Sequence, residues 1–224
     1  MDDSATTSLR GFGAGGIAAI VIVLLSGNIV LPNMIVLPAG ALLVLAWTSL
    51  SRTPLSDIGY VRPRSWPLSI AIAVAGGIGL KLLMKSFVMP LLGADPVNHA
   101  YHFLAGNRAI LPNAILAMFV VGFSEETVFR GFLFERLQKL FGSTVAARTA
   151  IIALTSLLFG LGHYQTQGLA GTEQATLTGL VFVTAFAATR SLYPVMIAHA
   201  AFDLTALAII YCDAESAVAH VLLR

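Results

Sequence analysis

Two adjacent glutamates and an arginine stand inside a strongly apolar stretch, "SEETVFRGFLFERL", at residues 124–137. On an α-helix, residues four positions apart share one face, so the spacing predicts an ion pair between Glu126 and Arg130. Such a pair could serve helix packing alone, but it leaves Glu125 turned about 100° away. Because a carboxylate in a poorly hydrated place is suited to take a proton from water, Glu125 is a candidate general base.

Two further apolar segments carry histidines. "FGLGH" places Phe159 and His163 four positions apart, and "HAAFD" does the same for His199 and Asp203. The Asp203 carboxylate can accept a hydrogen bond from His199 and fix its tautomer. Each histidine could instead be a structural hydrogen bonder between helices. Three segments that each supply titratable groups nevertheless favour one shared site, in which a carboxylate and two imidazoles activate water and stabilise an oxyanion during peptide hydrolysis.

Three other residues receive structural explanations. Lys81 and Lys85 lie four positions apart in an apolar segment and carry like charges, and we expect Lys85 to extend toward an interface. Cys212 is the single cysteine, which excludes an internal disulfide or a CxxC metal site. It follows an apolar run, so we expect it to be packed as a small apolar residue.

The composition indicates a membrane protein. Of 224 residues, 57% are hydrophobic and 11% are charged, whereas a soluble domain carries about 25% charged residues. The absence of a lysine- or arginine-rich run argues against nucleic acid as a partner. We expect one integral membrane domain over residues 1–224, with an all-α fold: a polytopic transmembrane helical bundle of about seven spans, between six and eight. The candidate spans are roughly 12–27, 29–50, 67–92, 110–138, 145–164, 174–190 and 192–212.

Basic residues beside these candidate spans indicate the orientation, because cytoplasmic loops are enriched in lysine and arginine. If the N-terminus is cytoplasmic, Arg108 and Arg224 fall outside, and the other flanking basic residues fall inside. The inside set is Arg10, Arg52, Arg62, Arg64, Arg136, Lys139, Arg148 and Arg190. We therefore expect a multi-pass protein of the bacterial plasma membrane with a cytoplasmic N-terminus.

Three motifs in order resemble those of the CPBP family, the CAAX proteases and bacteriocin-processing enzymes, also called the ABI or type II CAAX prenyl endopeptidase family. "EETVFR" fits EExxxR, "FGLGH" fits FxxxH and "HAAFD" fits HxxxN/D. The similarity covers about residues 110–213, which carry the catalytic motifs. The earlier segments match nothing more specific than a membrane helix.

The resemblance implies an intramembrane glutamic protease whose site opens to the cytoplasm and the membrane. Glu125 would be the general base on water, and His163 would hold and orient that water. His199 and Asp203 would line the oxyanion side. The supporting residues would be Glu126, Arg130 and Phe159. In the eukaryotic CAAX enzymes the position of Asp203 holds an asparagine, whose amide can donate a hydrogen bond to an oxyanion. An ionised aspartate cannot donate such a bond. Asp203 must therefore be protonated, or it must orient His199.

No cofactor is expected, and zinc is the alternative. Two histidines and a carboxylate can bind zinc, and the ligands would then be Glu125, His163 and His199. No HExxH motif is present, and the resemblance favours the metal-free glutamate mechanism.

The expected partners are the lipid bilayer and a membrane-associated protein or peptide substrate, which lipidation could anchor. Prenylated CAAX proteins are the eukaryotic substrates of the family. The expected reaction is hydrolysis of a peptide bond, and the same site could serve transpeptidation. One alternative is a non-catalytic membrane immunity or regulatory protein of the same family. A more distant alternative is an ion transporter that uses Lys81 and Glu125.

Overall fold

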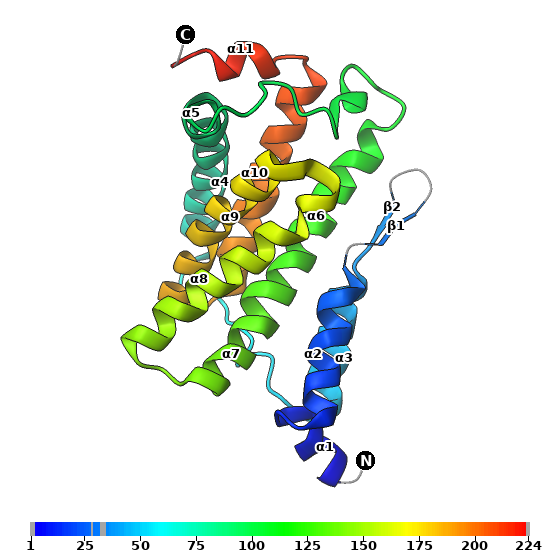
Figure 1. Ribbon diagram of the computed structural model, residues 1–224, viewed down its shortest axis with the longest axis vertical. Coiled ribbons are helices and arrows are strands. Elements are labelled where there is room, and N and C mark those ends of the chain that lie inside the picture. The colour runs from blue at the N-terminus through cyan, green and yellow to red at the C-terminus, as the bar shows by residue number, and fades with distance from the viewer. Residues whose placement is uncertain (1–2, 28, 32–34, 223–224) are drawn as a thin grey trace.

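The computed structural model describes residues 3–27, 29–31 and 35–222, which form a bundle of helices with α1 and α11 at opposite ends of its long axis (Figure 1). The α-helices are α1 (Asp3–Arg10), α2 (Ala14–Ser26), α3 (Ala39–Ser51), α4 (Trp66–Leu83), α5 (Met89–Leu91), α6 (Leu111–Glu126), α7 (Phe134–Phe141), α8 (Val145–Gly162), α9 (Tyr164–Thr189), α10 (Leu192–Tyr211) and α11 (Glu215–Ala219). The π-helical segments η2 (Met84–Val88) and η4 (Thr127–Leu133) and the 3₁₀ turn η3 (His102–Leu104) complete the helical part. The predicted all-α class is confirmed for the bulk of the chain.

A short antiparallel ribbon of β1 (Ile29–Leu31) and β2 (Ile35–Leu37) stands where the second candidate span was expected. The prediction of one helix over 29–50 is therefore wrong, since α3 begins only at Ala39. Both strands read Ile-Val-Leu, and a short apolar run rich in β-branched residues fits a strand as well as a helix.

Two π-helical segments join shorter helices into long ones. η2 continues α4 into α5, which gives one apolar helix from Trp66 to Leu91. η4 continues α6 into α7 and begins directly after Glu126. Wider turns of this kind occur often at functional sites, because they rotate the residues that follow around the helix axis. The π-helical segment η4 thus begins directly after Glu126 and contains Arg130, the two residues of the predicted ion pair.

Small residues bring α10 close to both of its main neighbours, α4 and α6. A Cβ added to Gly77 of α4 would lie 2.1 Å from the carbonyl oxygen of Ala198. A Cβ on Gly122 of α6 would lie 3.2 Å from the backbone nitrogen of Ala200 and 3.5 Å from Cγ of His199. Close approach at small residues is how membrane helices commonly associate. These two crossings fix the position of His199 relative to the end of α6.

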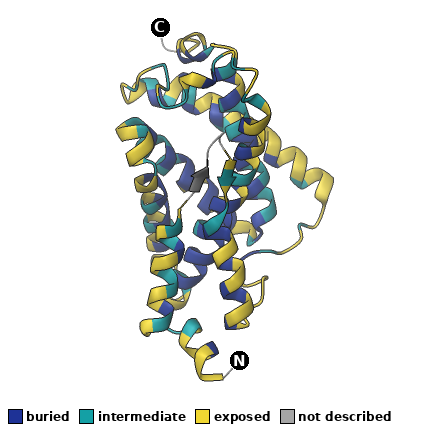
Figure 2. Ribbon diagram, turned by 90° about the vertical axis from the view of Figure 1, so that its right-hand side faces the viewer, coloured by how far each residue is buried: buried dark blue, intermediate teal, exposed yellow. Residues whose placement is uncertain are grey.

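The distribution of polar and apolar residues is that of a protein in lipid. Large apolar side chains such as Leu68, Ile72 and Leu116 are exposed, whereas the charged side chains of Glu126 and Arg130 are buried; Figure 2 shows exposed residues along the outer faces of the helices and buried ones within. Because an exposed apolar surface of this extent is unfavourable in water, it fits a lipid environment.

Among the described residues, three helices are long and apolar enough to cross a membrane, at Trp66–Leu91, Val145–Gly162 and Leu192–Tyr211. A fourth is possible if α1 and α2, which are bent by 58° relative to each other, form one broken span. The predicted count of about seven spans is not confirmed. α3 has only 13 residues, and the helix that runs from α6 to α7 carries the charged motif itself.

Candidate active site

Four predicted catalytic residues lie around one cavity of about 1180 Å³. Glu125 reaches it from the end of α6, His163 from the end of α8, and His199 and Asp203 from α10. Residues more than seventy positions apart in the chain, such as Glu125 and His199, therefore line one cavity. The residues that the sequence predicted to act together are close together, while their catalytic roles stay predictions.

Glu126 is bound by two donors at once. Nη1 of Arg130 donates to its Oε1 at 2.9 Å, which is the ion pair predicted from the spacing. Nδ1 of His199 donates to the same oxygen at 2.7 Å. The side chains of Glu126 and Arg130 are 0% and 1% exposed. A charge-assisted bond in such a dry place is strong and directional, so Glu126 fixes the imidazole as well as the arginine.

The tautomer of His199 therefore depends on Glu126 rather than on Asp203 as expected. With its Nδ1 proton on Glu126, the ring directs Nε2 toward two other carboxylates. Oδ2 of Asp203 lies 3.5 Å from Nε2, and Oε2 of Glu125 lies 3.7 Å from it. The spacing along α10 correctly placed Asp203 on the same face as His199, but only the packing of α6 against α10 brings Glu126 to Nδ1.

Aromatic rings enclose the charged groups. The Arg130 guanidinium carbon lies 4.3 Å from the centroid of the Phe159 ring, and that ring contacts the imidazoles of His163 and His199 at centroid distances of 4.9 and 6.0 Å. Phe182 of α9 lies 5.2 Å from His199 on the same measure. A cation stacked on an aromatic face is stabilised further when water is excluded. The Phe159 ring thus contacts the ion pair through Arg130 and also contacts both histidines.

Sequence reasoning missed Phe182 and Gly179, both on α9. Nη2 of Arg130 donates to the carbonyl oxygen of Gly179 at 3.3 Å, and a Cβ at this glycine would lie 3.0 Å from Cδ1 of Phe159. A phenylalanine and a glycine inside an apolar helix carry no sequence signal for a site. Their role follows only from the way α9 packs on α8.

His163 is held by its own helix. It caps the end of α8, is half-buried, and donates from Nδ1 to the carbonyl oxygen of Phe159 at 2.9 Å. Nε2 is then the unprotonated nitrogen of the neutral ring. An acceptor nitrogen beside a cavity can hold one proton of a water molecule, which matches the role that the resemblance implies.

The described part of the chain contains no group of three His, Cys, Asp or Glu side chains arranged to hold a metal ion. Zinc, with Glu125, His163 and His199 as its ligands, therefore stays the alternative to the metal-free mechanism.

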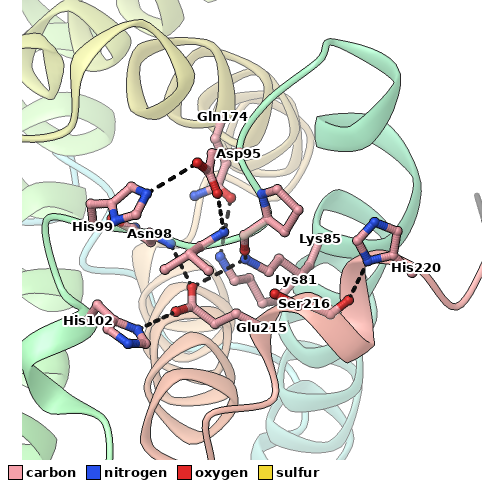
Figure 3. A network of polar contacts seen from close by, with 12 residues as sticks. Lys81, Lys85, Asp95, Asn98, His99, His102, Gln174, Glu215, Ser216 and His220 are labelled. Carbon is pink, nitrogen blue, oxygen red and sulfur yellow. Dashed lines mark hydrogen bonds and ion pairs between the residues drawn. The ribbon is translucent and has the colours of Figure 1, made fainter.

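The cavity extends from the site toward the end of the molecule that carries α11. There Glu215, whose side chain is 2% exposed, accepts from the backbone N–H of Asn98 at 2.9 Å, from Nζ of Lys85 at 3.3 Å and from Nδ1 of His102 at 3.2 Å (Figure 3). Burial raises the pKa of Glu215, but these hydrogen bonds outweigh it and hold the pKa below its ordinary value. Sequence reasoning missed this cluster, because its members come from three separate segments.

Cys212 differs from its expected state. It lies at the end of α10 and is exposed rather than packed, because the helix ends there and the chain turns into α11. The single thiol therefore lies on the surface of the described structure, between α10 and α11.

Residues 107–205 match a family model, that of the type II CAAX prenyl endopeptidases, Rce1-like. The family predicted from the three motifs is confirmed for this segment, which includes Glu125, His163, His199 and Asp203. No curated protein and no solved structure matches the chain.

Proposed function

We propose that this chain, in which residues 107–205 are an Rce1-like type II CAAX prenyl endopeptidase domain, is an intramembrane endopeptidase that hydrolyses a peptide bond of a membrane-associated protein or peptide. The observation that carries the proposal is the approach of the Glu125 carboxylate to within 3.7 Å of His199 Nε2 at a cavity that His163 also lines. A base, an acceptor for water and a hydrogen-bond donor are the groups that metal-free peptide hydrolysis requires.

In the proposed reaction Glu125 takes a proton from a water molecule that Nε2 of His163 orients. The water oxygen bonds to the scissile carbonyl carbon, and negative charge develops on the carbonyl oxygen. In this step the His199 ring is protonated on both nitrogens. Nδ1–H donates to Glu126, and Nε2–H donates to the oxyanion. The surrounding carboxylates balance the positive charge of the ring. The C–N bond then breaks, and Glu125 returns its proton to the leaving amine.

Asp203 has a positioning role in this scheme. Its carboxylate lies 3.5 Å from His199 Nε2, so it helps to hold the ring and does not itself donate to the oxyanion. The supporting group is Glu126 with Arg130 and Phe159, which together keep His199 in place.

We propose the metal-free version of this chemistry. Exhaustive chelation of the purified protein should leave peptide cleavage unchanged. Loss of cleavage on chelation, with recovery on addition of zinc, would show that the zinc alternative is correct.

Comparison of cellular proteomes tests the proposed function and identifies the substrate in the same experiment. The native host is studied with the unaltered protein, with Glu125→Gln and with Glu126→Gln, and new protein termini are mapped by mass spectrometry. We expect Glu125→Gln to accumulate at the normal level while specific termini disappear. If the host and its termini are unchanged in Glu125→Gln, the non-catalytic immunity or regulatory function is favoured instead.

We also propose that the protein is a multi-pass protein of the bacterial plasma membrane with a cytoplasmic N-terminus. Arg10 donates to the backbone carbonyls of Ser51 and Arg52, and Arg136 donates to the carbonyl oxygen of Arg10. Arg190 donates to Gln138 nearby. Basic residues from distant segments thus gather around α1 and α7, which supports a cytoplasmic face there.

A further inference from the structure

Lys81 is a buried cation in the wall of the catalytic cavity. It lies on α4, is 7% exposed, and donates from Nζ to Oε1 of Gln174 on α9 at 3.2 Å (Figure 3). The same nitrogen lies 4.9 Å from the centroid of the Phe202 ring. A lysine at such a place in a membrane helix costs several kcal/mol, roughly, unless a partner or water compensates its charge. From the sequence alone we expected Lys81 to have a structural role. The surroundings of Lys81 in the structure do not favour that role.

Lys85, one turn further along the same helix, shows how this fold neutralises a lysine. Its Nζ forms an ion pair with Glu215 at 3.3 Å and also donates to the carbonyl oxygen of Pro96. Within the described part of the chain, no comparable ion pair reaches Lys81. Asp203 and Glu215 act on it electrostatically from beyond ion-pair distance. An amide and an aromatic face compensate Lys81 only in part, so an anionic ligand would bind there favourably.

The same cavity wall leads from Lys81 to the catalytic residues. The Phe202 ring beside Lys81 packs against Phe182 at a centroid distance of 6.3 Å, and Phe182 packs against His199 at 5.2 Å. Gln174 and Asp203 line the same cavity. A peptide bound with its scissile bond at Glu125 could therefore reach Lys81 with a neighbouring part of its chain.

We propose that Lys81 and Gln174 form a subsite for a carboxylate of the peptide substrate. The ammonium group of Lys81 would pair with the carboxylate, and the amide N–H groups of Gln174 would donate to its second oxygen. The inference rests on the proposed function, since the subsite orients a substrate only if the cavity binds a peptide. An acidic side chain and a free C-terminal end share this chemistry, and the experiment separates them.

The test uses the purified full chain in detergent and three forms of one N-decanoylated apolar peptide. The first form has a free C-terminal carboxylate, the second a C-terminal amide, and the third a C-terminal amide and one internal glutamate. Binding is measured in the Glu125→Gln background as the shift in unfolding midpoint with peptide concentration. Cleavage is measured with the unaltered protein by mass spectrometry.

We expect at least one carboxylate form to bind about tenfold or more tightly than the neutral amide, because a hydrogen bond to a charged group is typically worth that much. The form that binds more tightly identifies the source of the carboxylate. Lys81→Met should abolish the preference, and Lys81→Arg should retain it. Gln174→Glu should also abolish it, because it supplies an internal carboxylate to Lys81. Lys85→Met is the matched control and should retain the preference.

Three results would overturn the proposed subsite. All three peptide forms could bind equally, or none could bind. The third result is a carboxylate preference that persists in both Lys81→Met and Gln174→Glu. A carboxylate preference in a protein that cleaves none of the peptides would support the subsite and count against the proposed hydrolysis. Cleavage without any preference would support hydrolysis and overturn the subsite alone.

Discussion

Glu126 is the residue on which the arrangement of the site depends most. It is fully buried and accepts from both Arg130 and His199. From the sequence it is only the partner of Arg130, so its substitution would be expected to affect stability alone. The bond to His199 adds a second consequence, because the imidazole loses the carboxylate that fixes its tautomer.

Glu126→Gln should therefore lower both stability and activity. Removal of one member of a buried ion pair leaves Arg130 without its closest charge partner and costs about 3–5 kcal/mol. The midpoint of thermal unfolding in detergent and the rate of peptide cleavage are the two measurements. Glu125→Gln is the matched control, because it removes a carboxylate one position away and should leave the unfolding midpoint nearly unchanged. An equally stable and fully active Glu126→Gln would show that this pair is dispensable.

At the scale of the helices, the site depends on how closely α10 approaches α4 and α6. Gly77→Ala should disrupt the first crossing, because the new Cβ would lie 2.1 Å from the carbonyl oxygen of Ala198 and 2.9 Å from Cβ of Ala201. We expect a loss of about 1–3 kcal/mol, as for other overpacked interiors, measured by thermal unfolding.

Gly76→Ala is the control for that substitution. Gly76 is adjacent and exposed, and a Cβ there meets nothing within 4 Å. It should leave stability unchanged or raise it slightly through the better helix propensity of alanine. Equal effects of the two alanines would argue against close packing of α4 on α10.

The segment around α11 should respond to acid through Glu215. Its pKa is held below the ordinary value of 4.5, so its carboxylate adds stability above that pH, and this contribution is lost as pH falls through the lower native pKa. The Lys85 ammonium group and the His102 imidazole are the basic groups that face it. Hydrogen exchange should show faster opening of α11 in Glu215→Gln than in the unaltered protein near neutral pH.

That difference between the two proteins should shrink at acid pH, where Glu215 is protonated and resembles glutamine. A difference that is constant across the acid range would mean that the charge of Glu215 does not hold α11. Tests at several pH values should compare the ratio of the two exchange rates, since intrinsic exchange itself depends on pH.

The sequence predicted the elements of the site better than their contacts. The ion pair of Glu126 with Arg130 could be predicted because both residues lie on one helix, where spacing determines contact. The bond from His199 to Glu126 could not, because it depends on the crossing of α6 and α10 at Gly122. The ribbon of β1 and β2 was missed because a short Ile-Val-Leu run has no period that separates strand from helix.

The span count illustrates the same limit. Hydropathy located the helices at Trp66–Leu91, Val145–Gly162 and Leu192–Tyr211. It could not show that α2 and α3 are short, or that α9 has a kink at Gly168 with a positive φ of 64°. Helix breaks at turns and glycines depend on tertiary packing, which the apolar pattern does not record.

For the whole molecule, the exposed Cys212 offers a direct test of orientation. It directly follows α10 and precedes α11, whereas α1 lies at the opposite end of the molecule (Figure 1). If the N-terminus is cytoplasmic, a membrane-impermeant maleimide should label Cys212 in intact cells. The control is Ser143→Cys in a Cys212→Ser background, which adds an exposed thiol after α7 and should be labelled only after permeabilisation.

The opposite labelling pattern would contradict the predicted orientation. The result also shows on which side of the membrane the α11 end lies, and the cavity extends toward that end. A cytoplasmic N-terminus and a cavity that opens to the cytoplasm, both expected from the sequence, are difficult to reconcile in this structure. Labelling from outside would place the α11 end, toward which the cavity extends, on the external side of the membrane.

The proposed reaction depends above all on Glu125 as the general base of a peptide hydrolase. The most direct measurement is kcat/KM of the purified Glu125→Gln variant on a substrate found in the proteome comparison, together with its unfolding midpoint. We expect kcat/KM to fall at least about 100-fold, as is typical of a lost general base, with the unfolding midpoint unchanged. A correctly folded Glu125→Gln whose activity stays within about threefold of the unaltered protein would contradict it.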